Sequence, residues 1–334
     1  MSGRATAEAP SNIAFVKYWG TRDLERTLPY NPSISMTLSR CVSRCTVERR
    51  PPAEGVEVLW RPEGGELAPA PEAFRAGVER HLRRLAATAG VESGFRVATA
   101  NTFPTGAGIA SSASGFAALA VAATAVLGLP AGWRELSARA RESGSGSAAR
   151  STLGGYVEWP APEALEGEHA AQLHPAGHWA LSDLVAVVDA SPKRVSSRDG
   201  HRAAPGSPYF ARRLELLPGR LDRVRRALAR RDMTELGPVI EEEALDLHLI
   251  AISSRPPIHY WRPGTLAVLE AARELRAEGV EVWATIDAGP NVHLICETGD
   301  EARVEERVAA LPEVERLIVD RVGEGPRLLD EHLV

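Results

Sequence analysis

A glycine- and hydroxyl-rich run over residues 101–114 is the clearest sign of chemistry in this sequence. It reads Asn-Thr-Phe-Pro-Thr-Gly-Ala-Gly-Ile-Ala-Ser-Ser-Ala-Ser and precedes an alanine-rich stretch that is predicted to be helical. The N-terminus of a helix presents unpaired N–H groups and the positive end of the helix dipole, both of which bind anions. We therefore expect Gly106, Gly108, Ser111 and Ser112 to line a pocket for nucleotide phosphates and their magnesium ion.

An alternative is that this run only joins a strand over residues 94–100 to a helix over residues 112–127. Its spacing alone favours neither interpretation. The run lacks the Gly-Lys-Ser/Thr ending of a Walker A loop, and no acidic residue follows about twenty positions later, as a dinucleotide-binding fold would require. Both common nucleotide loops are therefore disfavoured, and the other motifs must decide.

Lys17 is the next residue with a chemical role to consider, because it ends an apolar run that reads as a strand. Burying an ammonium group costs on the order of several kcal/mol unless an anion pairs with it. The alternative is a lysine that reaches out to solvent from the strand end, and the local pattern favours neither. Residues 31–39 place small hydroxyl side chains between apolar ones, which by itself favours an ordinary strand.

Residues 143–152 form a second Gly/Ser loop, Ser-Gly-Ser-Gly-Ser-Ala-Ala-Arg-Ser-Thr, which is predicted to enter a helix. Arg150 lies about one turn into that helix, where its fork of N–H donors would hold a carboxylate or a phosphate. Ser145 and Ser147 would bind the rest of the anion. A flexible linker is the alternative, but it would carry neither a following helix nor a single arginine.

Asp287 ends a predicted strand and lies directly before a Gly-Pro turn. Such a turn would fix the carboxylate at a sheet edge, beside a cleft between domains. Taken alone, the pattern favours an Asp that only caps the turn. The other motifs raise the case for a functional carboxylate.

Composition limits the partners that this chain can have. Its 334 residues, 44% of them hydrophobic, suffice for two cores, and the formal net charge is −5. Sequence-independent binding to nucleic acid or to an anionic membrane needs clustered Lys and Arg, so we expect neither partner. The three cysteines have no metal-ligand spacing, and we see no signal peptide or long apolar span. We expect a cytoplasmic protein whose cysteines are small buried hydrophobic residues.

Hydrophobic periodicity predicts an α+β fold in two domains, residues 1–182 and 183–334, divided near a loop-rich passage around residue 160. In the first domain we expect strands at 41–49, 56–60 and 94–100 and helices at 74–85, 112–127 and 136–142. In the second we expect strands at 183–189, 280–287, 292–297 and 315–320 and helices around 221–230, at 268–275 and at 300–311.

The helix around residues 221–230 also carries several arginines. Leu221, Val224 and Leu228 share one side, and Arg220, Arg223, Arg226 and Arg230 surround it. No aromatic residues lie between the arginines, so we interpret them as a solvated helix side and not as a nucleic-acid surface.

Together, these candidates suit phosphoryl transfer to a substrate that carries both phosphate and carboxylate. The loop Pro-Thr-Gly-Ala-Gly-Ile-Ala-Ser-Ser-Ala at 104–113 resembles the phosphate loop of the GHMP kinase superfamily. Over nearly its whole length the chain resembles the mevalonate diphosphate decarboxylase family. The matching stretches are residues 12–20 (Asn-Ile-Ala-Phe-Val-Lys-Tyr-Trp-Gly), Arg22-Asp23, Leu28-Pro29, Asn31, residues 101–115 and 144–155, Val157-Glu158-Trp159, Val195-Ser196-Ser197, Gly200, Pro256-Pro257-Ile258 and Asp287-Ala288-Gly289-Pro290-Asn291.

The resemblance implies a two-domain GHMP architecture with its active site between the domains. The N-terminal half would have a fold that also occurs in ribosomal proteins, and the C-terminal half would be an α/β sandwich. The implied reaction, in isoprenoid biosynthesis, uses ATP and Mg²⁺ to phosphorylate the 3-hydroxyl of mevalonate 5-diphosphate. Phosphate and carbon dioxide then leave, giving isopentenyl diphosphate. A homodimer is also implied.

The family motifs imply a role for each candidate residue. Asp287 would position or deprotonate the 3-hydroxyl and then stabilise the cationic carbon, Arg150 would hold the substrate carboxylate, and Lys17 would hydrogen-bond in the same cluster. Asn12 would orient the substrate. The remaining assignments are Tyr18, Ser145 and Ser147 at the 5-phosphate end, Pro104, Gly106, Gly108, Ser111 and Ser112 at ATP, and Ser111 and Ser112 at Mg²⁺. For the adenine, residues 60–69 are a candidate by position only.

The sequence departs from the family pattern at two places. Thr21 follows Gly20 where diphosphate-using relatives usually carry a lysine, and residues 198–201 read Arg-Asp-Gly-His in place of Thr-x-Gly-Met. A mevalonate 5-phosphate decarboxylase, giving isopentenyl phosphate, is therefore an alternative. Relatives that act only as mevalonate 3-kinases lack the Lys/Asp pair, which is present here.

Two other classes of function stay open on the sequence. Another small-molecule GHMP kinase, such as a homoserine or mevalonate kinase, would share the phosphate loop but not the motifs at 17–20 and 287–291. An RNA-binding protein is a third class, because the same half-domain fold occurs in translation proteins. The acidic balance and the lack of a basic and aromatic patch argue against it.

Overall fold

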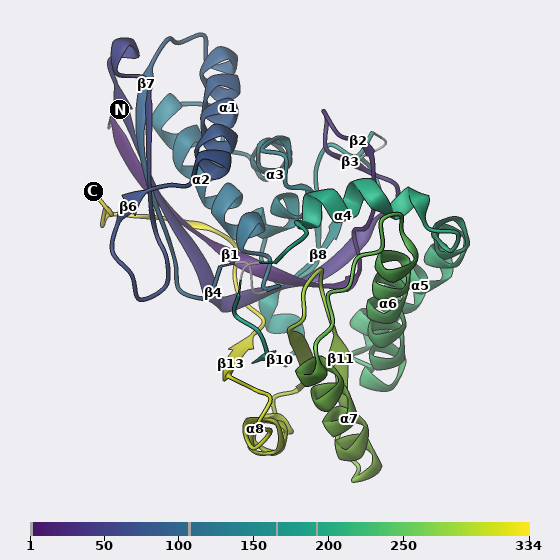
Figure 1. Ribbon diagram of the computed structural model, residues 1–334. Coiled ribbons are helices and arrows are strands. Elements are labelled where there is room, and N and C mark those ends of the chain that lie inside the picture. Colours follow the sequence, from purple (N-terminus) through teal and green to yellow (C-terminus); the bar gives the residue numbers. More distant parts are fainter. Residues whose placement is uncertain (1–2, 106–107, 165, 192) are drawn as a thin grey trace.

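Two long antiparallel strands extend from one lobe of the molecule toward the other. The computed structural model describes residues 3–105, 108–164, 166–191 and 193–334. Strand β1 (Arg4–Val16) pairs with β4 (Ser33–Arg50) along almost its whole length, and both pass from one lobe toward the other (Figure 1). Lys17 follows directly on the last residue of β1 and therefore lies where the two lobes meet.

The N-terminal lobe is built on a mixed sheet with the strand order β14-β1-β4-β7-β5-β6, to which β8 and β9 attach through β4. Only the β5–β7 pair in this sheet is parallel. The other strands are β5 (Val56–Arg61), β6 (Ala68–Pro69), β7 (Gly94–Asn101), β8 (Tyr156–Trp159), β9 (Ala171–His174) and β14 (Arg327–Leu329), and β2 (Thr21–Asp23) and β3 (Leu28–Pro29) form a separate hairpin. The helices are α1 (Glu72–Thr88), α2 (Ser111–Leu127) and α3 (Trp133–Glu142), with 3-10 helices η1 (Pro52–Glu54), η2 (Gly146–Thr152) and η3 (Ala176–His178).

Helix α2 packs on β1 and β4 and is buried along nearly its whole length, as its alanine content predicts. Small side chains let the helix approach the sheet closely. The hydroxyl of Ser112 at its first turn lies 3.5 Å from that of Ser145, and the carbonyl of Ile109 before the helix accepts a hydrogen bond from Ser11 on β1. The positive helix end therefore lies between β1 and the second Gly/Ser loop.

The C-terminal lobe is an antiparallel sheet with helices on both faces. Its strands are β11 (Val282–Thr285), β12 (Val292–Glu297), β10 (Leu181–Val187) and β13 (Arg316–Arg321), in that order across the sheet. Val185 and Val187 pack toward α5 (Phe210–Arg230) and α6 (Met233–Ser253), and Leu184 and Ala186 pack toward α7 (Pro263–Ala277) and α8 (Glu301–Ala309). The short helices α4 (Ser197–Ala203) and η4 (Ala204–Gly206) precede α5. The predicted two-domain α+β fold is confirmed.

Several sequence predictions differ from the structure in detail. The second Gly/Ser loop enters a 3-10 helix, not an α-helix, and the strand before Asp287 ends at Thr285. Arg220 was expected on a solvated side, but its side chain is only 11% exposed because α6 packs beside it and supplies three carboxylates. The cysteines are free and buried, as expected. No helix among the described residues is both long and apolar enough to cross a membrane.

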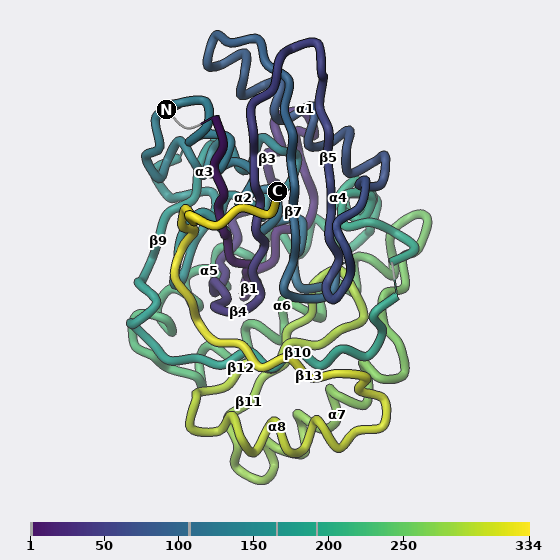
Figure 2. The backbone as a smooth tube through the Cα atoms, turned by 90° about the vertical axis from the view of Figure 1, so that its left-hand side faces the viewer, coloured from purple at the N-terminus to yellow at the C-terminus, as the bar shows by residue number. Residues whose placement is uncertain are grey.

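The end of the chain returns to the N-terminal lobe. Strand β14 pairs with β1 through Thr6 and Leu329, and the Thr6 hydroxyl lies 2.7 Å from Nδ1 of His332. Arg4 Nη1 donates to the carbonyl of Val334 at 3.0 Å. Figure 2 shows this last segment, in yellow, running up the outside of the N-terminal sheet.

Asp320 on β13 connects the two sheets. Its buried carboxylate accepts hydrogen bonds from the backbone N–H groups of Ser39, Arg40 and Cys41 at 2.7–2.9 Å, and from the Ser39 hydroxyl at 2.8 Å. These donors belong to the middle of β4, and the N–H group of Cys41 is the buried one among them. The carboxylate therefore fixes β4 to the C-terminal sheet.

We expect Asp320→Ala to lower the free energy of unfolding by at least about 3 kcal/mol, because the buried N–H of Cys41 and the part-buried donors of Ser39 and Arg40 lose their acceptor together. Urea denaturation followed by circular dichroism measures this loss. Asp222→Ala is the control, since this exposed residue makes only a surface ion pair with Arg225 and should cost less than about 1 kcal/mol. Equal losses in the two variants would contradict the role given to Asp320.

Candidate active site

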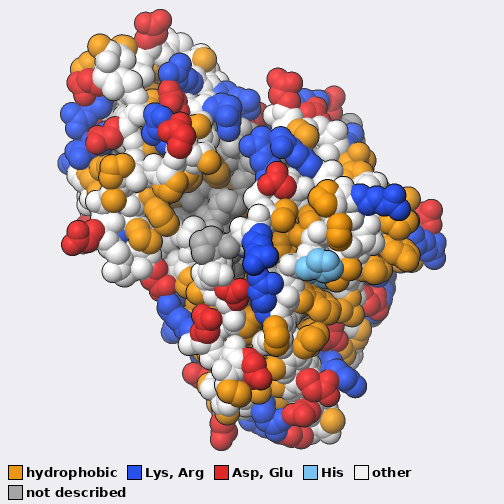
Figure 3. All heavy atoms as spheres, in the orientation of Figure 1, with side chains coloured by type: hydrophobic (Ala, Val, Ile, Leu, Met, Phe, Trp, Pro, Cys, Tyr) orange, Lys and Arg blue, Asp and Glu red, His pale blue; other side chains and the backbone are white. Residues whose placement is uncertain are grey.

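The candidate residues gather around a hollow between the two lobes. Figure 3 shows this hollow, with Lys and Arg side chains on its rim. The loop before α2 meets the turn after Asp287 there, because a Cβ placed on Gly289 would lie 3.3 Å from the Cα of Gly108. Gly108 itself has a φ of +83°, which favours glycine. Two motifs that lie far apart in the sequence therefore abut.

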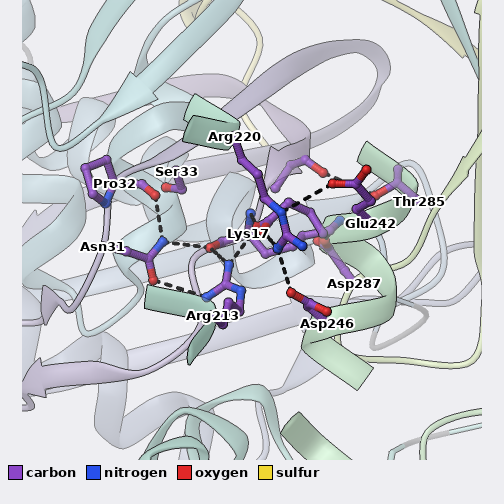
Figure 4. Close-up of polar contacts among 12 residues, drawn as sticks. Lys17, Asn31, Pro32, Ser33, Arg213, Arg220, Glu242, Asp246, Thr285 and Asp287 are labelled. Carbon is purple, nitrogen blue, oxygen red and sulfur yellow. Dashed lines mark hydrogen bonds and ion pairs between the residues drawn. The ribbon is translucent and has the colours of Figure 1, made fainter. Parts of the chain in front are cut away.

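Lys17 and Asp287 form an ion pair across the boundary between the lobes, with Nζ 2.6 Å from Oδ1. The lysine side chain is 1% exposed and the aspartate 24%, so the carboxylate is the member that faces the hollow. The structure thus places a buried, paired lysine where the sequence left two interpretations open. Figure 4 shows the pair between the end of β1 and the turn after β11.

Burial and pairing act in opposite directions on this pair. Burial would raise the pKa of Asp287, but the Lys17 ammonium outweighs it and holds the pKa of that carboxyl below its usual range. Burial lowers the pKa of Lys17, and the Asp287 carboxylate only partly compensates. The carboxylate is therefore kept ionised although water has limited access to it.

Arg150 is a buried cation whose partners are neutral. It donates to Oδ1 of Asn12 (3.0 Å from Nη2), to Oγ of Ser35 (2.9 Å from Nε) and to Oγ of Ser33. Burial lowers its pKa to about 10, and the nearby Asp287 charge partly opposes that shift. Within residues 3–105, 108–164, 166–191 and 193–334, no carboxylate forms an ion pair with this guanidinium. A buried, uncompensated cation of this kind attracts an anionic ligand.

Asn12 and the second Gly/Ser loop are joined in one hydrogen-bonded network. Asn12 Nδ2 donates to the Ser151 hydroxyl at 2.8 Å and to the Ser147 carbonyl at 3.3 Å. The hydroxyls of Ser145 and Ser147 lie 3.4 Å apart, and that of Ser112 at the start of α2 lies 3.5 Å from Ser145. The hydroxyls of both Gly/Ser loops therefore form one continuous polar row.

Tyr18 lies beside this row in an aromatic cluster. Its ring stacks on His201 with centroids 4.0 Å apart and meets Trp159 edge-on at 5.0 Å, and its hydroxyl is hydrogen-bonded to Oγ1 of Thr21. A Cβ on Gly146 would come within 2.7 Å of the Tyr18 ring, so glycine is required for this packing. Burial raises the pKa of Tyr18 to about 12, and its hydroxyl stays protonated.

A cavity of about 220 Å³ opens beside the first turn of α2. Trp60, Phe74 and Phe116 give it apolar walls, and Ser111 and Ser112 form its polar end. Flat aromatic walls next to a helix N-terminus suit a nucleotide, with the base on the rings and the phosphates at the helix. Trp60 belongs to the region expected by position to contact the adenine.

Two of the sequence-predicted nucleotide residues, Ser111 and Ser112, line this cavity. Ser111 and Ser112 are the first residues of α2, and Ala110 before them is in the left-handed conformation (φ 46°). Ser11 on β1 donates its hydroxyl to the carbonyl of Ile109, which anchors the loop. Pro104 lies in the same loop and is half-buried, and Gly106 lies outside the described residues. Hydroxyl oxygens at the helix start are ligands that Mg²⁺ accepts together with phosphate oxygens.

Lys193 is a further cation beside the hollow that sequence reasoning missed. Its Nζ donates to the carbonyl of Ala288 at 2.6 Å and to the Ser197 hydroxyl at 3.3 Å. Burial lowers its pKa, and Asp287 opposes that shift. A signal was available, because Lys17 and Lys193 are the only lysines among the 39 Lys and Arg residues.

Two family models together match most of the chain. The diphosphomevalonate decarboxylase-like N-terminal domain matches residues 9–171, and the mevalonate 5-diphosphate decarboxylase C-terminal domain matches residues 183–313. The chain belongs to the diphosphomevalonate decarboxylase family. The family resemblance expected from the sequence motifs is therefore confirmed.

Similar proteins of the diphosphomevalonate decarboxylase family extend over almost the whole chain. The diphosphomevalonate decarboxylase of Ganoderma lucidum is 35% identical over 309 residues, covering 86% of this chain and 77% of that protein. The crystal structure of mevalonate diphosphate decarboxylase from Staphylococcus aureus has a TM-score of 0.90 at 29% identity, covering 99% of each chain. A structure of MDDEF in complex with MVAPP, AMPPCP and magnesium has a TM-score of 0.88 at 33% identity, covering 98% of this chain and 99% of that chain.

Proposed function

We propose that this chain catalyses the ATP-dependent decarboxylation of mevalonate 5-diphosphate to isopentenyl diphosphate, with ADP, phosphate and carbon dioxide as the other products. One observation carries the proposal. An ionised carboxylate, Asp287, is paired with buried Lys17 and lies near Arg150, a buried guanidinium with no carboxylate partner among the described residues. Membership of the decarboxylase family and the MVAPP and AMPPCP in the MDDEF complex support the choice of substrates.

Asp287 acts on the 3-hydroxyl of the substrate. Its carboxylate accepts a hydrogen bond from that hydroxyl and takes its proton as the oxygen is phosphorylated. Because its pKa is held low, Asp287 is a weak base, and its larger contribution is to position the oxygen. ATP, bound with Mg²⁺, would supply the phosphoryl group. Its transfer to the 3-oxygen replaces hydroxide, a poor leaving group, with phosphate, a good one.

Arg150 holds the substrate carboxylate. Loss of phosphate builds positive charge at C3, and loss of carbon dioxide supplies the electron pair that forms the double bond. Because its pKa is held low, Asp287 releases the proton it took to water before this step. The carboxylate beside C3 is then ionised again and stabilises the developing cation in a site with little water. Asn12, which binds Arg150 through Oδ1, orients this end of the substrate.

The remaining candidates bind the two phosphate-bearing ends. Ser145, Ser147 and Tyr18 bind the 5-diphosphate of the substrate. Pro104, Gly106 and Gly108 form the loop around the ATP phosphates, with Ser111 and Ser112 also at Mg²⁺. Lys193 binds the terminal phosphate of ATP, and Trp60 with Phe74 binds the adenine.

We also propose that the protein is a cytoplasmic homodimer. Within each chain, the boundary between the two domains lies between residues 182 and 183. The two family models meet between residues 171 and 183, which supports that division. Leu245, Leu249 and Ile252 form an exposed apolar ridge on α6, which supports a covering protomer. Three free cysteines suit a reducing compartment. Sedimentation at several concentrations tests the dimer.

The substrate is tested by giving the purified enzyme ATP, Mg²⁺ and mevalonate, its 5-phosphate or its 5-diphosphate in parallel. We expect carbon dioxide to appear in step with ADP for the 5-diphosphate. The 5-phosphate is a second candidate, because the Thr21 side chain is a hydroxyl bound to Tyr18 and not a cation. Turnover of the 5-phosphate alone would replace the proposed substrate, and ADP without carbon dioxide would indicate a kinase.

We expect Asp287→Asn to lower kcat on the order of 100-fold or more, because the carboxylate is lost from the reacting centre. In Lys17→Met the carboxylate loses its ammonium while its burial stays, so its pKa rises. The acid limb of the kcat/KM profile should then move to higher pH. Lys193→Met is the matched control, because Lys193 bonds a carbonyl and should move this limb less. An unmoved limb in Lys17→Met would be inconsistent with the ion pair setting that pKa.

We expect Trp60→Ala to raise the KM for ATP about tenfold, because stacking on a base contributes roughly 1–3 kcal/mol. The KM for the mevalonate substrate should change little. Trp133→Ala is the control, since Trp133 is exposed on α3 and contacts His169 and Arg134 outside the nucleotide cavity. A normal KM for ATP in Trp60→Ala would place the adenine elsewhere.

A further inference from the structure

The backbone of Lys17 is held by charged side chains and not by a neighbouring strand. The β1–β4 ladder ends at Val16, so the peptide groups of Lys17 have no strand partner. The Lys17 N–H donates to Oε2 of Glu243 at 3.0 Å, and its carbonyl accepts from Nη2 of Arg213 at 2.8 Å. Asn31 Nδ2 donates to the same carbonyl at 2.9 Å.

Arg213 and Glu243 form a single buried unit. Arg213 Nη2 lies 2.7 Å from Glu243 Oε2, and the two side chains are 1% and 0% exposed. Arg213 comes from α5 and Glu243 from α6, so both helices reach the end of β1 through this pair. Figure 4 shows Arg213 between Lys17 and Asn31, with its guanidinium directed at the Lys17 backbone.

Stability alone explains this pair poorly. A buried ion pair contributes little net stability compared with apolar side chains of similar volume, because both charges must be desolvated. Apolar side chains would, however, leave the buried N–H and carbonyl of Lys17 without partners, which is costly. The Arg213–Glu243 pair therefore supplies the hydrogen-bond partners that the buried N–H and carbonyl of Lys17 require.

Helix α6 also approaches Asp287, the ion-pair partner of Lys17. His248 lies five residues after Glu243 on α6, and its ring is close enough to the backbone of Asp287 to affect the pKa of the ring. Burial lowers the pKa of His248 to about 3, so the ring is neutral and adds no charge to the site. Helix α6 thus contacts the backbones of both members of the ion pair.

We propose that Arg213 and Glu243 are positioning residues for Lys17, which set the geometry of the Lys17–Asp287 pair from behind the reacting centre. Neither residue touches the substrate in this proposal. It rests on the proposed function for its kinetic consequence, whereas its structural consequence does not depend on the reaction.

A neighbouring arginine provides a matched control. Arg220 Nη1 lies 2.6 Å from the other oxygen of Glu243, Oε1, and 2.6 Å from Oδ2 of Asp246. Removing either arginine takes one cation from Glu243 and leaves the other in place. Only Arg213, however, bonds the Lys17 backbone.

The test compares Arg213→Met with Arg220→Met. The protein contains two lysines, so labelling with ¹⁵N-lysine gives two backbone amide signals, that of Lys17 and that of Lys193 as internal reference. We expect Arg213→Met to speed hydrogen exchange at the Lys17 amide about tenfold. Arg213 binds Oε2 of Glu243, the oxygen that accepts from this amide, and also the Lys17 carbonyl, whereas Arg220 binds the other oxygen, Oε1. Arg220→Met should leave that exchange within about threefold of the wild type.

The kinetic readout is kcat with the KM for ATP as reference. Displacement of a catalytic group by about 1 Å costs on the order of 100-fold, so Arg213→Met should lower kcat by that factor at an unchanged KM for ATP. Arg220→Met should stay within about threefold. Equal effects of the two variants on exchange and kcat, or a normal Lys17 amide in Arg213→Met, would overturn the proposal.

Separate controls distinguish a loss of folding from a failure of the proposed function. If thermal melting shows that Arg213→Met does not fold, Arg213→Lys replaces it, since lysine keeps the charge beside Glu243 but lacks the planar fork that also reaches the Lys17 carbonyl. Its amide exchange and kcat should then change in the same direction by a smaller factor, and wild-type values would overturn the proposal. If the wild type does not decarboxylate the substrate, the proposed function fails, and the amide exchange still decides the positioning role.

Discussion

The ion pair between Lys17 and Asp287 is the contact on which the arrangement of this molecule depends. Lys17 follows β1 of the N-terminal lobe, and Asp287 follows β11, an edge strand of the C-terminal sheet. The pair exists only when the two lobes are docked. Two further contacts hold the strands that carry this docking: the carboxylate of Asp320, on β13, binds β4, and the Arg213–Glu243 pair binds the end of β1.

Around this pair the site holds more buried positive charge than negative charge. Arg150, Lys17 and Lys193 surround Asp287, and Arg150 has only neutral donors and acceptors beside it within the described residues. Burying cations without counter-ions is unfavourable, so part of the stability of the lobes is given up to keep this site. An anionic ligand supplies the missing charge. A substrate with a carboxylate and phosphates then binds favourably because its negative charges pair with cations that are already buried in the folded protein.

The sequence predicted the parts of the site that depend on local chemistry. Gly/Ser loops before helices and the turn after Asp287 have recognisable local patterns, and these predicted elements occur in the structure. The parts that depend on tertiary packing were not predictable in this way. Helix α5 was predicted only from residue 221 on, and α6 was not predicted; each contains an internal proline, Pro218 in α5 and Pro238 in α6. The pairing of Glu243 with a backbone 226 residues away leaves no local pattern at all. Lys193 differs, because the scarcity of lysine would have revealed it.

The return of the last strand to the first has a consequence for how the protein is made. Strand β1 lies between β14 and β4, and β14 is formed by residues 327–329. In the order of synthesis β1 is made long before β14. Until β14 is made, the N–H and carbonyl groups of Thr6, Ala7 and Glu8 on that side of β1 are open to any passing strand. The nascent chain is therefore exposed to mispairing at this edge while its C-terminal lobe is still emerging.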